Sequence, residues 1–213
     1  MTGIIPAADD PVEISPRLWD GFSGDLAFEV GANCGRSLPM MMSRFTRVVA
    51  FEPYPAACDI ARQVPGADVR CMAVSDHDGD ATFRLHRDQF MSAGHDGYQR
   101  PDPAERITGW ETVTAPCATL DMIAAREGSP DFINVDVEGH ELAVLHGATG
   151  IINGDHPPAW LIEFHSETLH DACVIFLESA GYAVETVRHP HYAPRSVNYA
   201  QHGWLRAHPG GRA

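Results

Sequence analysis

Residues 25–35, DLAFEVGANCG, decide the fold, because they join a short apolar run to a turn that contains two glycines. The apolar run over 25–30 predicts a buried strand. Leu38, Met41, Met42 and Phe45 follow at helical spacing, which predicts a helix packed in the core. Glycines let the backbone turn sharply and approach a ligand, and the first amides of a helix are free to donate hydrogen bonds. The stretch therefore predicts a strand, a ligand-facing turn and a helix.

The same alternation of strand and helix continues outward along the chain. Further strands are expected over 47–52, 68–74, 81–86, 111–115, 132–137, 159–164, 182–187 and 197–206. Helices are expected over 57–63, from about 119, after residue 140 and over about 169–180. Strands that alternate with helices are typical of a parallel sheet covered on both faces. The fold class expected is α/β, with a mostly parallel seven-stranded sheet and helices on both faces.

A single domain over residues 1–213 accounts for the length and the 44% hydrophobic content. Residues 1–24 are expected to form an N-terminal extension. Residues 87–110 are rich in Gly, Pro and charge and lack clear periodicity. Because they are longer than an ordinary connection, they form either a substrate-facing loop, which is the favoured expectation, or a mobile loop.

The charge and the residue types exclude several classes of function. A formal net charge of -14 argues against a nucleic-acid partner, because phosphate binding needs clustered cations. All the basic residues are Arg, so a lysine cannot act as Schiff base or general base. We read the absence of Lys as codon bias, and the Arg-, Ala- and Gly-rich composition as that of a GC-rich bacterial genome.

Cysteine usage and hydropathy bear on the compartment. The odd number of cysteines, with no CxxC pair, predicts free thiols in a reducing compartment. No secretory leader and no apolar run long enough for a membrane span is expected. The expectation is a cytoplasmic protein with no membrane partner, and a homodimer stays open as an assembly state.

Glu52 joins the glycine turn in a first candidate site. It stands at the end of the second expected strand, where a carboxylate can accept hydrogen bonds from both hydroxyls of a ribose. The turn reads GxNxG and lacks the GxGxxG spacing that brings a pyrophosphate close to a helix. Glu29 precedes the turn; it would repel a pyrophosphate but suits the ammonium of an amino-acid tail. These residues favour S-adenosylmethionine over a nicotinamide dinucleotide.

Several segments of the chain, in order, resemble the FkbM-like family of S-adenosylmethionine-dependent methyltransferases. They are FEVGANCG, VVAFEPYP, AVSDHDGDATF, TLDMI, DFINVDVEGHELAVLHGA and AWLIEFH. The long DVEGHELAVLHGA segment is the specific part, and Glu29 departs from the commoner Asp. The resemblance implies a Rossmann-like class I methyltransferase fold and O-methylation of hydroxyls in polyketides, glycans or sugars.

Carried over by position, the resemblance also implies a set of cofactor-binding residues. Glu52 would hold the ribose. The methionine part would be bordered by Glu29, Gly31, Asn33, Gly35 and Ser37, and the adenine by Ala73, Val74, Ser75 and Asp76, with Pro53 and Tyr54 in the wall of that pocket. Asp136 is a further cofactor-binding residue. For most of them, except Glu52 and the glycines, a purely structural loop or packing role is an equal alternative.

A second candidate site lies at the ends of two neighbouring strands and does not depend on the resemblance. Asp136, Glu138 and His140 follow one strand, and Glu163 and His165 end or follow the next. Because the carboxyl ends of parallel strands open onto one edge, these side chains can converge beside the cofactor. Carboxylates and imidazoles there suit a divalent cation or a general base.

Methyl transfer to a hydroxyl needs either a divalent cation or a general base, because a neutral alcohol is a poor nucleophile and must lose its proton. Asp136, Glu163 and His165 are the expected ligands if Mg²⁺ or Mn²⁺ is present. His140 is the first choice as base, and Glu138 and His165 are the other catalytic candidates. Structural roles stay open: Glu138 could form a salt bridge, and His140 could cap the helix that it precedes.

The expected function is O-methylation of a small molecule, with a sugar or oligosaccharide such as a mannoside favoured over a polyketide or other natural product. A wet, acidic edge that contains histidine suits a polyol better than a flat ring. Two other classes remain as alternatives, a nicotinamide-dependent reductase and a noncatalytic nucleoside-binding module.

Overall fold

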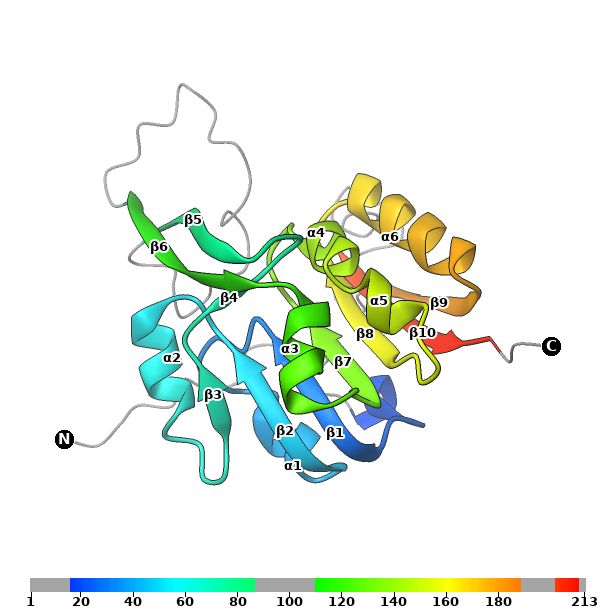
Figure 1. Cartoon of the computed structure of the whole chain (residues 1–213), viewed down its shortest axis with the longest axis horizontal. Helices are drawn as coiled ribbons and strands as arrows, with labels where there is room; N and C mark the ends of the chain where they lie inside the picture. The colour runs from blue at the N-terminus through cyan, green and yellow to red at the C-terminus, as the bar shows by residue number, and fades with distance from the viewer. Residues whose placement is uncertain (1–15, 87–109, 189–201, 211–213) are drawn as a thin grey trace.

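A seven-stranded sheet forms the centre of the computed structural model, which describes residues 16–86, 110–188 and 202–210 (Figure 1). Its order is β3-β2-β1-β7-β8-β10-β9. The strands are β1 (Gly24–Val30), β2 (Phe45–Phe51), β3 (Asp68–Arg70), β7 (Phe132–Val135), β8 (Ala159–Phe164), β9 (Tyr182–Arg188) and β10 (Gly203–Pro209). Only β10 runs antiparallel to its neighbours β8 and β9. The prediction of a mostly parallel seven-stranded sheet is confirmed.

Helices cover both faces of this sheet, as the alternation of strand and helix predicts. They are α1 (Leu38–Met42), α2 (Pro55–Ala61), α3 (Leu120–Glu127), α4 (Glu141–His146), α5 (Thr149–Ile152), α6 (Glu167–Ser179) and the 3-10 helix η1 (Pro16–Trp19). Figure 1 shows α3 to α6 in front of the sheet. The arrangement is an α/β fold with a mostly parallel sheet between two layers of helices, as expected.

The period of two along β1 divides the buried side chains between two cores. Leu26, Phe28 and Val30 pack in one core with residues of α3, α4 and α6. Ala27 packs in the other core with residues of η1, α1 and α2. Successive side chains of a strand point to opposite faces, so a run that is apolar on both faces requires cover on both sides. Met41 is fully buried in the second core, which confirms the packing role expected for it.

A smaller three-stranded sheet of order β4-β6-β5 lies beside the carboxyl ends of the main strands. It contains β4 (Ala73–Val74), β5 (Gly79–His86) and β6 (Trp110–Ala118). The single strand expected over 68–74 was therefore wrong, because the chain leaves the main sheet after Arg70 and enters this second sheet at Ala73. Phe45 also departs from expectation: it begins β2 and does not extend the preceding helix.

The cysteines depart from the expectation that all five thiols are free. Cys58 of α2 and Cys71, just after β3, form a disulfide with a Cα–Cα distance of 5.7 Å. Cys34, Cys117 and Cys173 form no disulfide. The fold brings together two cysteines that are 13 residues apart, a proximity that spacing alone does not reveal.

Two expected segments fall partly outside the described residues. Of the N-terminal extension, η1 is described, and Leu18, Trp19 and Phe22 are buried in the second core. The loop expected over 87–110 lies outside the described residues except for Trp110. None of the helices in the described part of the chain is long and apolar enough to cross a membrane.

Candidate functional site

The turn after β1 lies against the loop after β7, and Gly31 makes this approach possible. Its φ of 91° is in the left-handed region, and a Cβ atom built there would lie 1.7 Å from the backbone oxygen of Asp136. The amides of Gly31 and Ala32 both donate to the carbonyl of Phe51, at 2.9 and 3.0 Å. Only a residue without a side chain fits, because any Cβ would overlap the carbonyl.

Glu52 and the turn after β1 form one hydrogen-bonded unit. The Asn33 amide donates to Oε2 of Glu52 at 2.8 Å, and the Tyr54 amide donates to Oε1 at 2.8 Å. Burial raises the pKa of the Glu52 carboxyl, and the two amide donors work in the opposite direction. The loop and the acid, which the sequence suggested as parts of one site, are in direct contact.

Asn33 itself carries the features of a ligand-facing residue. Its φ of 47° is left-handed, a conformation that Asn tolerates better than most residues. Its side-chain oxygen Oδ1 is buried and has no hydrogen-bond partner within the described residues. A buried acceptor of this kind calls for a donor, and a bound ligand can supply one.

Glu29 lies below the turn and is almost completely buried. The Ser37 hydroxyl donates to its Oε1 at 2.5 Å. Two of the residues expected to border the methionine part, Glu29 and Ser37, are thus joined to each other, one before Gly31 and one after Gly35 in the sequence.

The residues expected near adenine belong to the second sheet and the turn after it. Ala73 and Val74 form β4 and are buried, and Ser75 is buried after them, whereas Asp76 is exposed. The Ser75 hydroxyl donates to Asp76 Oδ1 at 3.1 Å. Pro53 is half-buried after Glu52.

His140 precedes α4 and contacts Ser75. Its Nε2 lies 2.7 Å from Ser75 Oγ, with the hydrogen on either atom depending on the tautomer. Burial lowers the pKa of the His140 imidazole, although Asp76 and Glu141 act in the opposite direction. The ring is therefore neutral at neutral pH, as a general base must be.

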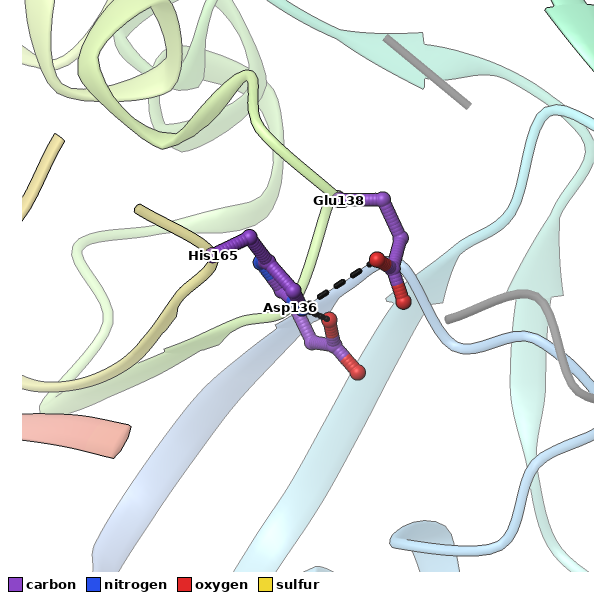
Figure 2. Close-up of side chains that lie close together, drawn as sticks. All are labelled: Asp136, Glu138 and His165. Carbon is purple, nitrogen blue, oxygen red and sulfur yellow. Dashed lines mark ion pairs between the residues drawn. The ribbon is translucent and has the colours of Figure 1, made fainter. Parts of the chain in front are cut away.

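Asp136, Glu138 and His165 converge at the ends of β7 and β8, as Figure 2 shows. His165 Nε2 lies 3.2 Å from Glu138 Oε2 and 3.6 Å from Asp136 Oδ1. One nitrogen or oxygen from each residue lies within 4.8 Å of the others, a grouping that could hold a metal ion. Glu138 reaches this position through a left-handed φ of 56°.

Glu163, one of the three predicted metal ligands, also lies beside His165. Its Oε1 is 3.8 Å from His165 Nε2, but it is not one of the three grouped residues. The group contains the predicted ligands Asp136 and His165 together with Glu138. A metal-binding role for any of them stays a prediction.

Glu141 is a site residue that the sequence reasoning missed. It has no exposed side-chain surface, and its Oε1 lies 2.9 Å from His165 Nδ1 while also accepting the Gly139 amide at 2.9 Å. The signal was present in the helical pattern, because Glu141, Val144 and Leu145 share the buried face of α4.

His165 is held among carboxylates on several sides. Burial opposes a charge on its ring, but the hydrogen bond with Glu141 and the charges of Glu138 and Asp136 outweigh it and raise the pKa of His165 well above the ordinary histidine value. His202, also missed, is buried, and its ring lies 5.9 Å from that of His165. His202 lies near His165 because the next residue, Gly203, pairs with Phe164. Only the order of the strands in the sheet reveals this pairing.

Comparison with known proteins gives a family match over most of the chain. The family model described as the methyltransferase FkbM domain matches residues 29–184. No curated protein matches the sequence. The match includes the turn after β1, Glu52, the β7 and β8 ends and Glu141.

Solved structures share the fold at low identity. The FkbM methyltransferase from Methylobacillus flagellatus KT superposes with a TM-score of 0.59 and 20% identity, over 88% of this chain and 44% of that one. The chain thus spans less than half the length of that protein. An rRNA methylase from Streptococcus thermophilus gives a TM-score of 0.55 at 9% identity, over 96% of this chain and 99% of that one.

Proposed function

We propose, from the premise that this chain belongs to the FkbM methyltransferase domain family, that it transfers a methyl group from S-adenosylmethionine to a hydroxyl oxygen of a small molecule. The observation that carries the proposal is the contact between the Asn33 amide and the Glu52 carboxylate, which unites the turn and the acid in one binding unit. That unit fits a nucleoside with an amino-acid tail.

Glu52 is the proposed ribose ligand. A carboxylate has about four acceptor positions on its two oxygens, and the amides of Asn33 and Tyr54 use one on each. The remaining positions are available to the two ribose hydroxyls. Tying both oxygens to the backbone also fixes the carboxylate before the ligand arrives, which reduces the entropy lost on binding.

The other proposed cofactor contacts surround Glu52. Gly31, Asn33, Gly35, Ser37, Glu29 and Asp136 are proposed for the methionine part, and Pro53, Ala73, Val74, Ser75 and Asp76 for the adenine. The buried acceptor Oδ1 of Asn33 supports this assignment, because it lacks a donor within the described residues.

When bound, S-adenosylmethionine supplies an electrophilic sulfonium methyl group. The acceptor hydroxyl must lose its proton as its oxygen bonds to the methyl carbon and the carbon–sulfur bond breaks. We assign the proton to His140, whose imidazole is neutral because burial lowers its pKa. If Ser75 donates to Asp76, then Nε2 of His140 donates to Ser75, and Nδ1 is the basic nitrogen.

The acceptor is proposed to be a sugar or oligosaccharide, such as a mannoside. Asp136, Glu138 and Glu163 supply carboxylate oxygens at the edge where the acceptor would meet the cofactor, and hydroxyl groups donate well to carboxylates. Glu138 and His165 are the further residues proposed to act on the acceptor. A divalent cation, Mg²⁺ or Mn²⁺, is part of the proposal.

Calorimetric titration with S-adenosylmethionine, S-adenosylhomocysteine and NAD tests the proposal. We expect the first two to bind at one site per chain and NAD to bind at least about a hundredfold more weakly, since the turn lacks pyrophosphate spacing. Tighter binding of NAD would instead support a reductase. Binding of S-adenosylmethionine without turnover on any hydroxyl compound would support a noncatalytic module.

A further inference from the structure

We propose that Asp136, Glu138 and His165 bind one divalent transition-metal cation, best matched by Mn²⁺, and that the buried Glu141 holds His165 in position for it. The inference revises the ligand set predicted from the sequence, in which Glu163 stood in place of Glu138. The catalytic role of the cation rests on the proposed methyl transfer, but its binding does not.

The separations within the group fit a bound cation. Ligand atoms about 2.1 Å from one ion lie about 3.0 Å apart at adjacent octahedral positions and about 3.4 Å apart at tetrahedral ones. His165 Nε2 lies 3.2 Å from Glu138 Oε2 and 3.6 Å from Asp136 Oδ1. In Figure 2 the three side chains reach the same region from the ends of two different strands. An ion can therefore enter with only small shifts of the side chains.

The donor atoms around His165 also suit a cation. Carboxylate oxygens of Glu141, Glu138, Asp136 and Glu163 all lie within 3.8 Å of a ring nitrogen of His165. The His165 side chain is 10% exposed, so the group is largely shielded from water. Carboxylate oxygens beside an imidazole nitrogen are ligands that divalent transition metals accept.

Glu141 provides a second observation, independent of the three ligands. Its side chain is fully buried, and its Oε2 has no hydrogen-bond partner within the described residues. A buried carboxylate oxygen without a partner costs the folded protein free energy. Its Oε1 faces His165 Nδ1 and directs Nε2 toward Asp136 and Glu138. Carboxylate contacts of this kind orient metal-binding histidines and make them better ligands.

The donor set selects the class of cation. One imidazole and two carboxylates are softer than the all-oxygen sets that Ca²⁺ and Mg²⁺ prefer, yet they lack the thiolates common in structural zinc sites. Three protein ligands also leave coordination positions for an acceptor oxygen. A cation there would lower the pKa of the acceptor hydroxyl beside the base.

The test is Mn²⁺ binding to the full chain after removal of metals with chelator, followed by electron paramagnetic resonance. We expect one Mn²⁺ per chain, at least tenfold tighter than Mg²⁺, with the nitrogen modulation of a coordinated imidazole. Glu138→Gln and Asp136→Asn should each weaken Mn²⁺ at least tenfold. Glu141→Gln should weaken it about tenfold and reduce the nitrogen modulation, which a purely structural role would leave unchanged.

Asp171→Asn is the matched control. Asp171 also contacts a histidine, His170, but its side chain is largely exposed and lies outside the group of Asp136, Glu138 and His165. It should bind Mn²⁺ as the unaltered chain does, and Glu163→Gln should stay within about threefold. S-adenosylhomocysteine affinity of Glu138→Gln, measured in parallel, reports whether that variant is folded.

Absence of saturable Mn²⁺ binding to the unaltered chain would overturn the proposal and leave His165 as an ion-paired imidazolium only. Loss of binding in Glu163→Gln but not in Glu138→Gln would overturn the ligand assignment. Failure to bind S-adenosylhomocysteine would defeat the proposed function instead, while the Mn²⁺ result would remain readable.

Discussion

Two histidines on the same edge of the sheet have opposite electrostatic surroundings. His140 is half-buried beside the Ser75 hydroxyl, and desolvation lowers the pKa of its imidazole. His165 is largely but not fully buried against carboxylates, and its pKa is raised well above the ordinary histidine value although desolvation opposes this. Surroundings that shift two pKa values in opposite directions suit the two groups to different roles. His140 is suited to act as a base, and His165 as a ligand or electrostatic partner. The sequence showed both residues but not this difference, because Glu141 and Ser75 reach them only through the fold.

The pH dependence of methyl transfer tests the role of His140. The base must be unprotonated, so activity is present above its pKa and is lost as the pH falls through it. Burial lowers that pKa, so the midpoint of the acid limb in the pH profile of kcat/KM should lie below about pH 6.5, the ordinary histidine value. His140→Ala should reduce kcat by about a hundredfold or more and remove this limb.

His146→Ala is the control for that measurement, since His146 lies on the same helix and is exposed. It should retain both the rate and the acid limb. An acid limb that persists in His140→Ala would assign the proton transfer to another group.

Glu52→Ala should weaken S-adenosylhomocysteine binding at least about tenfold. A hydrogen bond to a charged group contributes about 1.5 to 3 kcal/mol, and about 1.4 kcal/mol corresponds to a tenfold change in affinity. Calorimetry on the folded variant measures the loss. Asp59→Ala, an exposed acid on the adjacent helix α2, should bind as the unaltered chain does. Equal affinity in the two variants would contradict the ribose assignment.

At the scale of elements, the contact between the turn after β1 and the loop after β7 joins the cofactor side of the site to the acceptor side. Gly31 allows it, since a Cβ atom there would overlap the Asp136 carbonyl. The sequence indicated that a glycine was needed for a sharp turn. The close backbone approach could not be predicted, because it depends on the adjacency of β1 and β7, which are separated by about half the chain.

Gly31→Ala should destabilise the protein by about 3 kcal/mol or more, through both the overlap and the left-handed φ. For a chain of this length that corresponds to a fall in Tm of roughly 6 to 12 °C, measurable by calorimetry. Gly66→Ala is a matched control, because Gly66 has a similar φ of 84° but no neighbour closer than 3.7 Å. Equal Tm values for the two variants would show that the contact is not tight.

The elements differ in how far local pattern could predict them. β1, β8 and α6 follow from continuous apolar runs and helical spacing, and the structure has them close to the expected bounds. The division of residues 68–74 into β3 and β4 could not be predicted, since both halves are equally strand-like and only tertiary pairing separates them. The acidic residue of α4 was missed because a charged side chain on a buried face contradicts the usual pattern.

For the whole molecule, the sequence predicted the sheet and its helical cover, because strands alternate with helices over nearly the entire length. It did not predict the Cys58–Cys71 disulfide, which depends on how α2 lies beside the end of β3. Nor did it predict that Glu138 lies closer to His165 than Glu163 does. The position of Glu138 depends on a left-handed backbone there, for which Glu gives no local signal.

The net charge of the chain predicts that its acceptor is not RNA. The fold that it shares with an rRNA methylase does not decide the class of acceptor. At -14 the chain should have no salt-dependent affinity for RNA, since it has few cations to replace the counterions of the phosphates. Fluorescence anisotropy with labelled RNA at about 50 mM and 200 mM salt measures this. Tight binding at low salt that falls steeply with added salt would redirect the search for an acceptor toward RNA.

The most direct test of the central claim is mass spectrometry of sugars, glycosides and hydroxylated natural products after incubation with S-adenosylmethionine that carries a deuterated methyl group. We predict that at least one sugar or glycoside gains the labelled methyl as a base-stable ether, in amounts equal to the S-adenosylhomocysteine formed, and that Glu52→Ala reduces both products together. Formation of S-adenosylhomocysteine with the label on nitrogen or carbon, or binding of the cofactor with no label on any oxygen, would contradict the account.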